Sequence, residues 1–349
     1  MMRMTVLASG SKGNSAVVAS SQTRILVDAG LSCRELMRRM AAAGEDPYAL
    51  DAILITHEHA DHVSGLPVMA RKLGIPVYFT ESTHRAWVRQ MTPRTTMSYK
   101  QWLEKNAREK QERLEAQALA HQIAEASRDE ALPDDHFFAH DVDVDAVDAT
   151  TDPVGALAAA ASEDLCEDLP VAVKAGIKSD PAFLPAVEYF HAGRHLSIGD
   201  IDVLPFTIPH DAADPCGFVF SAEGLRFGFA TDLGYVPENV KLALKNCDVL
   251  LLESNHDLEM LRDGPYPWSV KQRVLSRVGH LSNAAAAEFL TRDYDGGARY
   301  VVLAHLSESN NLPELARMAA ESALGNRLSL LGNQLLLAPQ SAPMESLCL

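Results

Sequence analysis

The 349-residue sequence lacks the marks of a disulfide-rich, secreted or membrane-spanning protein. Its five cysteines are odd in number, scattered and never spaced as C-x-x-C, which argues against a disulfide framework or a cysteine-based zinc site. No window approaches the ~20 apolar residues that a membrane-spanning helix needs. The N-terminal residues lack the long apolar stretch of a secretory signal. We therefore expect a protein of the reducing cytoplasm that makes no membrane contact.

Basic side chains are also scarce, because 31 Lys and Arg stand against 47 Asp and Glu and leave a formal net charge of −16. This balance excludes a general basic surface for nucleic acid, although it does not exclude one local site. The excess of acidic side chains is unevenly distributed along the chain, since residues 92–190 hold 9 basic and 20 acidic side chains. The composition, 47% hydrophobic and 22% charged, is that of a globular protein with a sizeable core.

Short β-prone runs and helical patterns form two strand-rich halves, each closed by helices. In the first half we expect strands at 5–9, 16–19, 24–28, 52–56 and 77–80, and helices at 33–42, 66–73 and 82–90. In the second half we expect strands at 196–198, 201–206, 217–220, 225–230, 249–252, 300–303 and 329–337, and helices at 236–245, 269–278, 282–290 and 312–323. Two sheets packed face to face with helices outside satisfy this pattern.

The densest chemical signal is T-H-E-H-A-D-H at residues 56–62, directly after an expected buried strand. Such a concentration of imidazoles and carboxylates is hard to explain as core, since these groups are rarely buried unpaired. His57 and His59 fall on one side of an extended chain, and a tight turn then presents Asp61 and His62 elsewhere. One loop can therefore supply two ligands to each of two metals. This ligand set suits zinc, manganese or iron, whereas a merely solvated polar loop rarely has this density of histidine.

Two ligand pairs do not fill two coordination shells, so further ligands should lie at other strand ends. His210, Asp232 and His305 each follow a β-prone run. A lone histidine at a strand end is usually structural. The three together, in this order after residues 56–62, are much more specific for a metal site.

With these residues in place, the chain resembles the metallo-β-lactamase superfamily over nearly all of residues 4–337 outside the acidic segment. The resemblance implies an α/β (α+β) fold, a four-layer αββα sandwich with two divalent metal ions at one edge of the sheets. Zinc and manganese fit the ligands, as does iron. The implied ligands of one metal are His57, His59 and His210, those of the other are Asp61, His62 and His305, and the bridging residue is Asp232. Asp28 would orient a ligand from behind, with a simple turn-initiating role as the equal alternative.

Further features narrow the resemblance to one part of the superfamily. The first is an aspartate, rather than a cysteine, at the bridging position. Four motifs resemble those of the YycJ/WalJ-type bacterial family, which is associated with 5′→3′ exonuclease activity on DNA. They are S-G-S-K-G-N-S at 9–15, P-H-D at 209–211, E-S-N-H-D at 253–257 and G-H-L-S-N at 279–283. The last motif is also similar to the G-H-x-S element of ribonuclease J. The implied chemistry is phosphodiester hydrolysis, in which two metal ions lower the pKa of a bridging water and clamp phosphate oxygens.

The expected catalytic residues are Asp61, Asp232 and His280, of which His280 would stabilise phosphoryl charge or protonate the leaving oxygen. Ser282 also has the position of a helix N-cap. No coordination place is left for His256, which we interpret as pocket wall behind the ligands. The candidates for substrate binding are Lys12, Asn14, Ser282 and Asn283.

Two other functions use the same site residues. A thioester or lactone hydrolase of the glyoxalase-II-like type needs the same metals, and a ribonuclease needs the same phosphodiester chemistry. The motifs at 253–257 and 279–283 favour a phosphodiester over a thioester. A non-catalytic scaffold is disfavoured, because competent residues fill all seven ligand positions.

Residues 92–184 depart from the family pattern. Residues 102–128 have the composition of a long polar helix, and residues 129–168 alternate acidic and small side chains in the manner of weakly structured chain. We therefore expect one catalytic domain, residues 1–91 and 185–349, with residues 92–184 inserted as a helical arm and acidic tether. The insertion would repel DNA from part of the surface or bind a basic partner protein.

Overall fold

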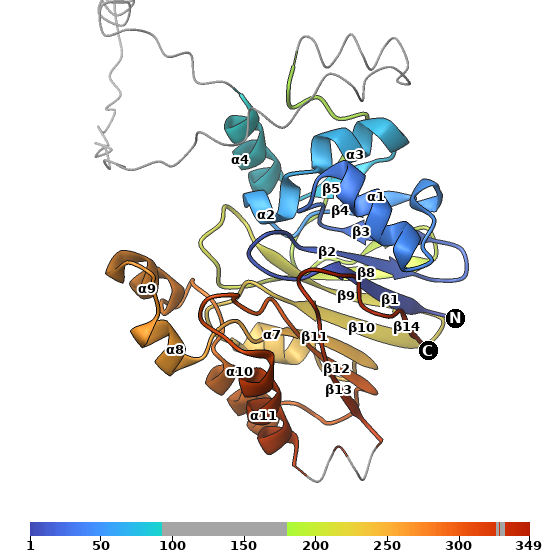
Figure 1. The fold of residues 1–349 in the computed structure, drawn as a ribbon. Coiled ribbons are helices and arrows are strands. Elements are labelled where there is room, and N and C mark those ends of the chain that lie inside the picture. Colours follow the sequence, from blue (N-terminus) through green and yellow to red (C-terminus); the bar gives the residue numbers. More distant parts are fainter. Residues whose placement is uncertain (93–179, 326–327, 329–331) are drawn as a thin grey trace, which may run out of the picture. The chain divides into compact units, whose positions relative to one another are not determined.

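The computed structural model describes residues 1–92, 180–325, 328 and 332–349. These residues form two seven-stranded sheets packed face to face, with helices on the outer face of each sheet (Figure 1). The αββα sandwich expected from the sequence is therefore confirmed. The helical arm expected at 102–128 and the acidic run at 129–168 lie outside the described residues. None of the described helices combines the length and apolar character needed to span a membrane.

The first sheet has the spatial order β14–β1–β2–β3–β4–β5–β6. Its strands are β1 (Arg3–Ala8), β2 (Ser15–Ala19), β3 (Arg24–Val27), β4 (Ala52–Leu54), β5 (Val77–Phe79), β6 (Val187–Tyr189) and β14 (Leu347–Cys348). Strands β3 to β6 are parallel to one another, so their carboxyl ends share one edge of the sheet. Residues 56–62 follow β4 at that edge.

The second sheet has the order β13–β12–β11–β10–β9–β8–β7. Its strands are β7 (Leu196–Ile198), β8 (Ile201–Thr207), β9 (Cys216–Ala222), β10 (Leu225–Ala230), β11 (Val249–Glu253), β12 (Tyr300–Ala304) and β13 (Gln334–Leu337). Strands β10, β11 and β12 are parallel. Strand β8 runs in the same direction as β10, because both pair antiparallel with β9. The chain therefore leaves β8, β10, β11 and β12 at a common edge.

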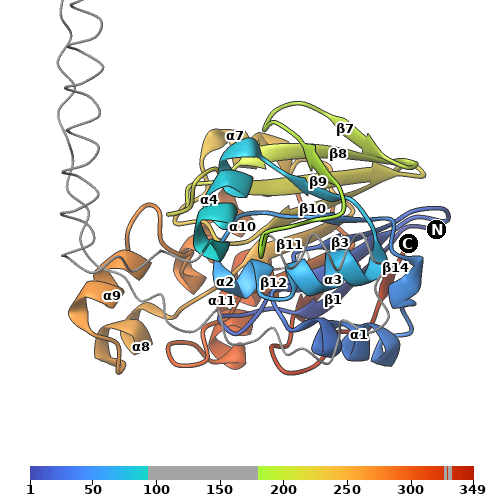
Figure 2. The same cartoon turned by 90° about the horizontal axis from the view of Figure 1, so that it is seen from above.

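Helices cover both outer faces of the sandwich, and in the view from above those of the first sheet lie in front (Figure 2). The first sheet is covered by α1 (Cys33–Ala42), α3 (Leu66–Leu73) and α4 (Glu81–Met91), and the second by α7 (Glu238–Ala243), α10 (Asn283–Arg292) and α11 (Pro313–Leu324). Shorter helices are α2 (Ala60–Val63), a 3-10 turn (Pro47–Ala49), α8 (Leu258–Asp263) and α9 (Trp268–Val274). Ser32 caps α1, since its hydroxyl accepts a hydrogen bond from the Glu35 N–H at 3.3 Å.

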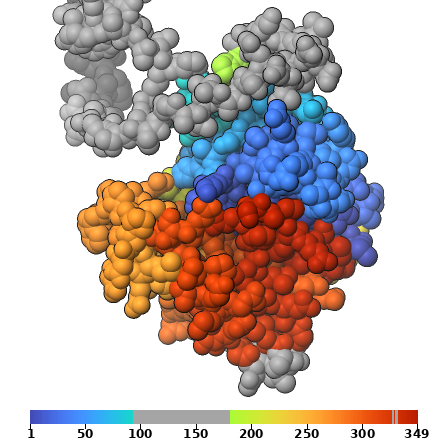
Figure 3. All heavy atoms as spheres, in the orientation of Figure 1, coloured from blue at the N-terminus to red at the C-terminus, as the bar shows by residue number. Residues whose placement is uncertain are grey.

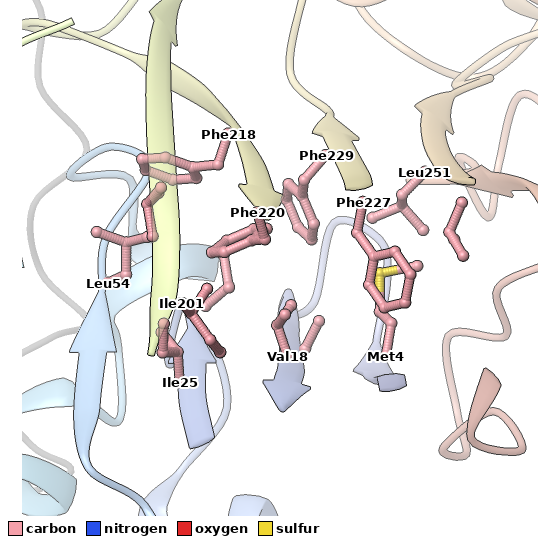
Figure 4. Packing of buried hydrophobic residues seen from close by; sticks show 14 of the residues in the cluster. Met4, Val18, Ile25, Leu54, Ile201, Phe218, Phe220, Phe227, Phe229 and Leu251 are labelled. Atoms are coloured by element: carbon pink, nitrogen blue, oxygen red, sulfur yellow. The ribbon is translucent and has the colours of Figure 1, made fainter. Parts of the chain in front are cut away.

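The core between the sheets is dominated by phenylalanines of the second sheet (Figure 4). Phe218 and Phe220 of β9 face this core, whereas Val219 between them packs under the outer helices. This alternation is the two-residue period of a strand buried on both faces. Burial of one such aromatic side chain contributes about 1.5–3 kcal/mol. The result is a rigid scaffold beneath the edge where the polar loops emerge.

Several expected boundaries were wrong, for local reasons. The strand expected at 52–56 ends at Leu54, because residues 55–62 already belong to the edge loop. The helix expected at 269–278 ends at Val274. Its continuation turns away because the Val278 carbonyl accepts a hydrogen bond from the Asp211 N–H at 3.0 Å. Helix α8 and strand β14 were not expected, since six and two residues are too short for a periodic pattern.

The expected insertion ends at residue 184, which is buried in the structure. Ala182 and Leu184 are packed in the core beneath α1, α3 and α4. The compact fold therefore includes the last residues of the segment 92–184.

Candidate metal centre

Residues 56–62 form a short loop that enters α2 and places its histidines against both sheets. His57 and His62 are fully buried, while His59 and Asp61 are partly exposed. The loop is held close to the first sheet by Gly30, where a Cβ atom would lie 1.7 Å from the Asp61 carbonyl oxygen. Only glycine allows that approach, which gives a physical reason for the V-D-A-G sequence at 27–30.

The remaining expected ligands come from strand ends of the second sheet. His210 follows β8, Asp232 follows β10 and His305 follows β12. Asp232 and His305 have positive φ angles of 62° and 56°, and Asp28 at the end of β3 has a φ of 59°. Residues other than glycine adopt this left-handed conformation at a cost, and such strain is concentrated at functional sites. The chain therefore turns sharply after β10 and β12, where Asp232 and His305 enter the edge.

The structure brings all seven expected ligand residues together. Within each of three sets the candidate ligand atoms lie within 4.8 Å of one another, and the sets are His57–His59–His210, His57–His62–Asp232 and Asp61–His62–His305. The sets share His57 and His62, so they form one continuous cluster. Each set contains at least two imidazoles and offers nitrogen and oxygen donors that suit a divalent transition metal.

Each imidazole of the cluster has one ring nitrogen anchored to the protein. The Nδ1 atoms of four of them have these partners within 3.1 Å: the Thr56 hydroxyl for His57, Asp28 Oδ2 for His62, the Gly279 carbonyl for His210 and Glu253 Oε1 for His305. His59 is held the other way round, with Nε2 at 3.2 Å from the Asp211 carbonyl and Nδ1 at 3.3 Å from Nε2 of His210. This arrangement fixes which nitrogen of each ring points into the cluster, as metal-ligating histidines require.

Three polar atoms at the centre of the cluster have no hydrogen-bond partner among the described residues. They are Nε2 of His57, Oδ2 of Asp232 and Nε2 of His305, and all three are buried. Buried polar atoms are nearly always paired, because an unpaired one costs about 1–3 kcal/mol. Bound divalent cations would satisfy these atoms, so the residues present fit a metal site.

The imidazoles and carboxylates of the cluster shift one another's pKa values. Burial acts to lower the pKa of His62, but the carboxylates of Asp232, Asp28 and Asp61 raise it well above its usual value. Burial acts to raise the pKa of Asp232, but the imidazoles of His305 and His62 hold it well below the usual range. Metal ions would therefore replace protons on imidazoles that lie beside carboxylates.

Glu253 is a central site residue to which the sequence analysis gave no role, although it begins the E-S-N-H-D motif at 253–257. Its fully buried carboxylate accepts hydrogen bonds from His280 Nδ1 at 2.8 Å and His305 Nδ1 at 2.9 Å on one oxygen. The other oxygen accepts from the backbone N–H groups of Leu233 at 2.8 Å and Leu281 at 3.3 Å. Burial acts to raise the pKa of Glu253, but His280 and His305 lower it to about 2. An acidic residue at the end of a run as apolar as 249–252 was the available signal.

His280 lies beside the cluster, with Nδ1 at 3.8 Å from Asp232 Oδ1. Its side chain is about one-fifth exposed, whereas the neighbouring His305 is buried. Because Glu253 occupies Nδ1, the Nε2 atom of His280 is the nitrogen left for a substrate. His256, by contrast, is buried and neither of its ring nitrogens has a partner in the described structure. Burial lowers the pKa of His256 to about 4, so the ring is neutral.

The expected substrate-binding residues are placed very differently from one another. Asn14 is buried, and its Nδ2 atom lies 3.2 Å from Asp61 Oδ2 and 3.0 Å from His62 Nε2. Lys12 is exposed and pairs with Glu308 at 2.7 Å. Ser282 caps α10 as expected, because its hydroxyl accepts from the Ala285 N–H.

Asn283, the fourth candidate, has its amide within the fold. Its Oδ1 accepts from the Ser254 hydroxyl at 2.6 Å, and its Nδ2 donates to Asn311 Oδ1 at 2.8 Å. These bonds join the loop after β11 to the start of α10. Both amide atoms of Asn283 are therefore engaged within the protein, and substrate binding by Asn283 stays a prediction.

An αββα sandwich with histidines and aspartates gathered at one edge of both sheets defines a metal-binding protein of the hydrolase type. The model of the metallo-beta-lactamase superfamily matches residues 8–266, and the chain belongs to this superfamily. The resemblance inferred from residues 56–62, 210, 232 and 305 is therefore confirmed.

Curated relatives match nearly the whole chain. It is 31% identical over 322 residues to the exodeoxyribonuclease WalJ of Streptococcus pneumoniae serotype 2 (strain D39 / NCTC 7466), which covers 92% of this chain and 88% of that protein. It is 31% identical over 323 residues to the exodeoxyribonuclease YycJ of Bacillus anthracis, with 93% and 89% covered. Among solved structures, it is similar in fold to the metallo-beta-lactamase fold protein YhfI from Bacillus subtilis, with a TM-score of 0.54, 12% identity and coverage of 98% and 99%.

Proposed function

We propose that the protein is a metal-dependent phosphodiesterase that degrades DNA as a 5′→3′ exonuclease. The observation that carries the metal dependence is the set of anchored imidazoles, each with one nitrogen fixed by the protein and the other directed into a shared cluster. The two relatives named as exodeoxyribonucleases, similar over nine-tenths of the chain, support DNA as the substrate.

We assign two divalent ions to the cluster, as zinc or manganese, with iron also compatible. His57, His59 and His210 would hold one ion, Asp61, His62 and His305 the other, and Asp232 would lie between them. When bound, the ions supply positive charge for the phosphate and lower the pKa of a water molecule. The buried, unpaired Oδ2 of Asp232 supports its bridging position.

The chain's own residues supply orientation and a proton. Asp28 accepts hydrogen bonds from His62 Nδ1 and from the Thr56 hydroxyl, both at 2.8 Å, and so keeps Nε2 of His62 directed inward. Glu253 does the same for His305 and also holds His280. His280, partly exposed and free at Nε2, would donate a proton to the leaving oxygen or stabilise charge on the phosphoryl group. Lys12 is exposed and can contact a phosphate once it leaves Glu308.

The function is tested with 5′-labelled duplex DNA and a thioester, each incubated with the full chain and added manganese or zinc. We expect nucleotide release from the 5′ end of DNA and no thioester cleavage. Cleavage of the thioester alone would refute the proposal and favour the glyoxalase-II-like alternative, and preference for an RNA strand would favour a ribonuclease. Asp61→Ala serves as the inactive control. Full activity in this variant would contradict the assigned site.

For residues 92–184 we propose an accessory role, either repulsion of DNA from part of the surface or binding of a basic partner protein. A deletion should end at residue 179, since Ala182 and Leu184 belong to the core. A nuclease rate and salt dependence unchanged by this deletion would contradict the repulsion. We also place the protein in the cytoplasm, because Cys33, Cys216 and Cys247 are buried free thiols.

A further inference from the structure

A basic segment near the metal centre has no part in the proposed chemistry. Residues 264–278, here called the arm, contain α9 and lead directly to His280. The chain has a net charge of −16, yet the 24 residues from 264 to 287 contain no aspartate or glutamate. The arm carries Lys271, Arg273 and Arg277. All charged side chains of the arm are therefore basic.

The arm also exposes apolar side chains. Trp268 is 67% exposed, and Val270, Leu275 and Val278 are exposed as well. Helices α8 and α9 stand out from the sandwich in Figure 1, and their orange atoms form a lobe at the side of the molecule in Figure 3. Exposed tryptophan next to cations is typical of binding surfaces rather than of ordinary solvent-facing helices.

Backbone hydrogen bonds tie the end of the arm to the metal centre. The Val278 carbonyl accepts from the Asp211 N–H at 3.0 Å, and the Gly279 carbonyl lies 3.1 Å from His210 Nδ1. The Val274 carbonyl accepts from the His280 N–H at 3.0 Å. The end of the arm is therefore joined to the loop that carries His210.

An aromatic–cation stack lies at the junction of the arm and the site. The Arg277 guanidinium lies 4.3 Å from the centroid of the Tyr235 ring, and Tyr235 is three residues after Asp232. Gly234 permits this contact, since a Cβ atom there would lie 2.4 Å from the Arg277 backbone. Among the described residues no carboxylate pairs with Arg277, whereas Arg273 is engaged by Asp211. The charge of Arg277 is therefore available to a phosphate.

We propose that the arm binds the single-stranded DNA that leads into the active site, with a base stacked on Trp268 and phosphates contacted by Lys271 and Arg277. This inference rests on the proposed nuclease function. Single-stranded nucleic acid is the occupant favoured by charge complementarity and by the continuity of the arm with the ligand loops. Aromatic side chains and cations along one track are the usual means of holding a strand without reading its sequence.

The test measures binding of a fluorescein-labelled phosphorothioate oligothymidylate, which resists cleavage, to the full-length protein by fluorescence anisotropy. Trp268→Ala is compared with Tyr48→Ala, whose aromatic ring is 68% exposed before β4 at the opposite end of the sheet. Arg277→Ala is compared with Lys245→Ala, an exposed cation before β11 at the end away from the site. Thermal unfolding shows whether each variant is folded.

We expect Trp268→Ala to weaken binding by roughly 5- to 150-fold, the range for loss of one base-stacking contact. Trp268→Phe should restore most of the affinity. Arg277→Ala should reduce the salt dependence of log Kd by about 0.7, the value for one phosphate of a single strand. The two control variants should bind like the unaltered chain.

Equal affinity of Trp268→Ala and Tyr48→Ala would overturn the proposal. So would a change of oligomeric state in Trp268→Ala by sedimentation, because the arm would then be an interface between copies of the chain. The outcome is separable from the proposed function. If binding depends on the arm but no added metal supports DNA cleavage, only the nuclease activity is refuted. If DNA is cleaved but binding does not depend on the arm, only the role of the arm is refuted.

Discussion

Replacing Glu253 with glutamine removes one negative charge from the centre of the site and changes almost nothing in shape. The native carboxylate accepts two imidazole N–H groups on one oxygen and two backbone N–H groups on the other. A glutamine has one oxygen and one NH2 group. In either orientation, two N–H donors lose their acceptor and face another donor.

The structure sets the size of the effect. Each buried donor left unpaired costs about 1–3 kcal/mol, so we expect Glu253→Gln to lower the free energy of unfolding by roughly 2–6 kcal/mol. If the NH2 group faces the imidazoles, Nδ1 of His305 must become an acceptor and its proton moves to Nε2. Nε2 is the atom we assign to the metal, so metal affinity should fall by about 10- to 100-fold.

The assay is metal content by mass spectrometry after dialysis, together with thermal unfolding during titration with zinc or manganese. Glu45→Gln is the matched control, because Glu45 is also a buried carboxylate that accepts hydrogen bonds, from Arg3 and Thr5, but it touches no ligand. We expect the control to lose stability and to keep its metal. Equal metal affinity in both variants would refute the role given to Glu253.

Three further predictions concern neighbouring groups. Asp28→Asn should reduce metal affinity by about 10- to 100-fold, measured by competition with a chelator, because an amide NH2 facing Nδ1 of His62 moves that proton to Nε2. His280→Ala should keep its metal content and lose about 10²- to 10⁴-fold in kcat on DNA, and unchanged kcat would remove His280 from proton transfer. In the metal-free protein the pKa of His62 is raised, so its contribution to stability is complete below about pH 6.5 and is lost as pH rises toward the higher folded value. Thermal unfolding of the metal-free chain between pH 6 and 9 checks this sign, and metal binding should release protons in calorimetry.

The sequence was most informative where candidate site residues directly follow a strand. Residues 56–62 directly follow a short apolar strand, and His210, Asp232 and His305 each follow another, so the ligand candidates could be recognised one strand end at a time. The superfamily resemblance built on them is confirmed. The αββα layers also followed from the order of strands and helices, because alternation and helix caps are local properties.

Contacts between distant segments could not be predicted in the same way. Glu253 was noted only as the first residue of the E-S-N-H-D motif, and only the packing of β11 against β12 brings its carboxylate within 2.9 Å of His305. A helix was expected over 269–278 of the arm, but α9 ends at Val274 because the Val278 carbonyl bonds to the Asp211 N–H.

The sequence by itself therefore determined the class of chemistry, through the identity and order of the ligand residues. The tertiary structure decided which nitrogen of each imidazole faces the cluster, since that depends on partners such as Asp28, 34 residues from His62, and Glu253, 52 residues from His305. It also decided that the arm ends beside the ligand cluster, because residues 278 and 279 bond to the loop after β8. A sequence pattern reflects interactions between residues that are close along the chain. The proton positions and the electric field of a site depend on segments that meet only in the folded chain.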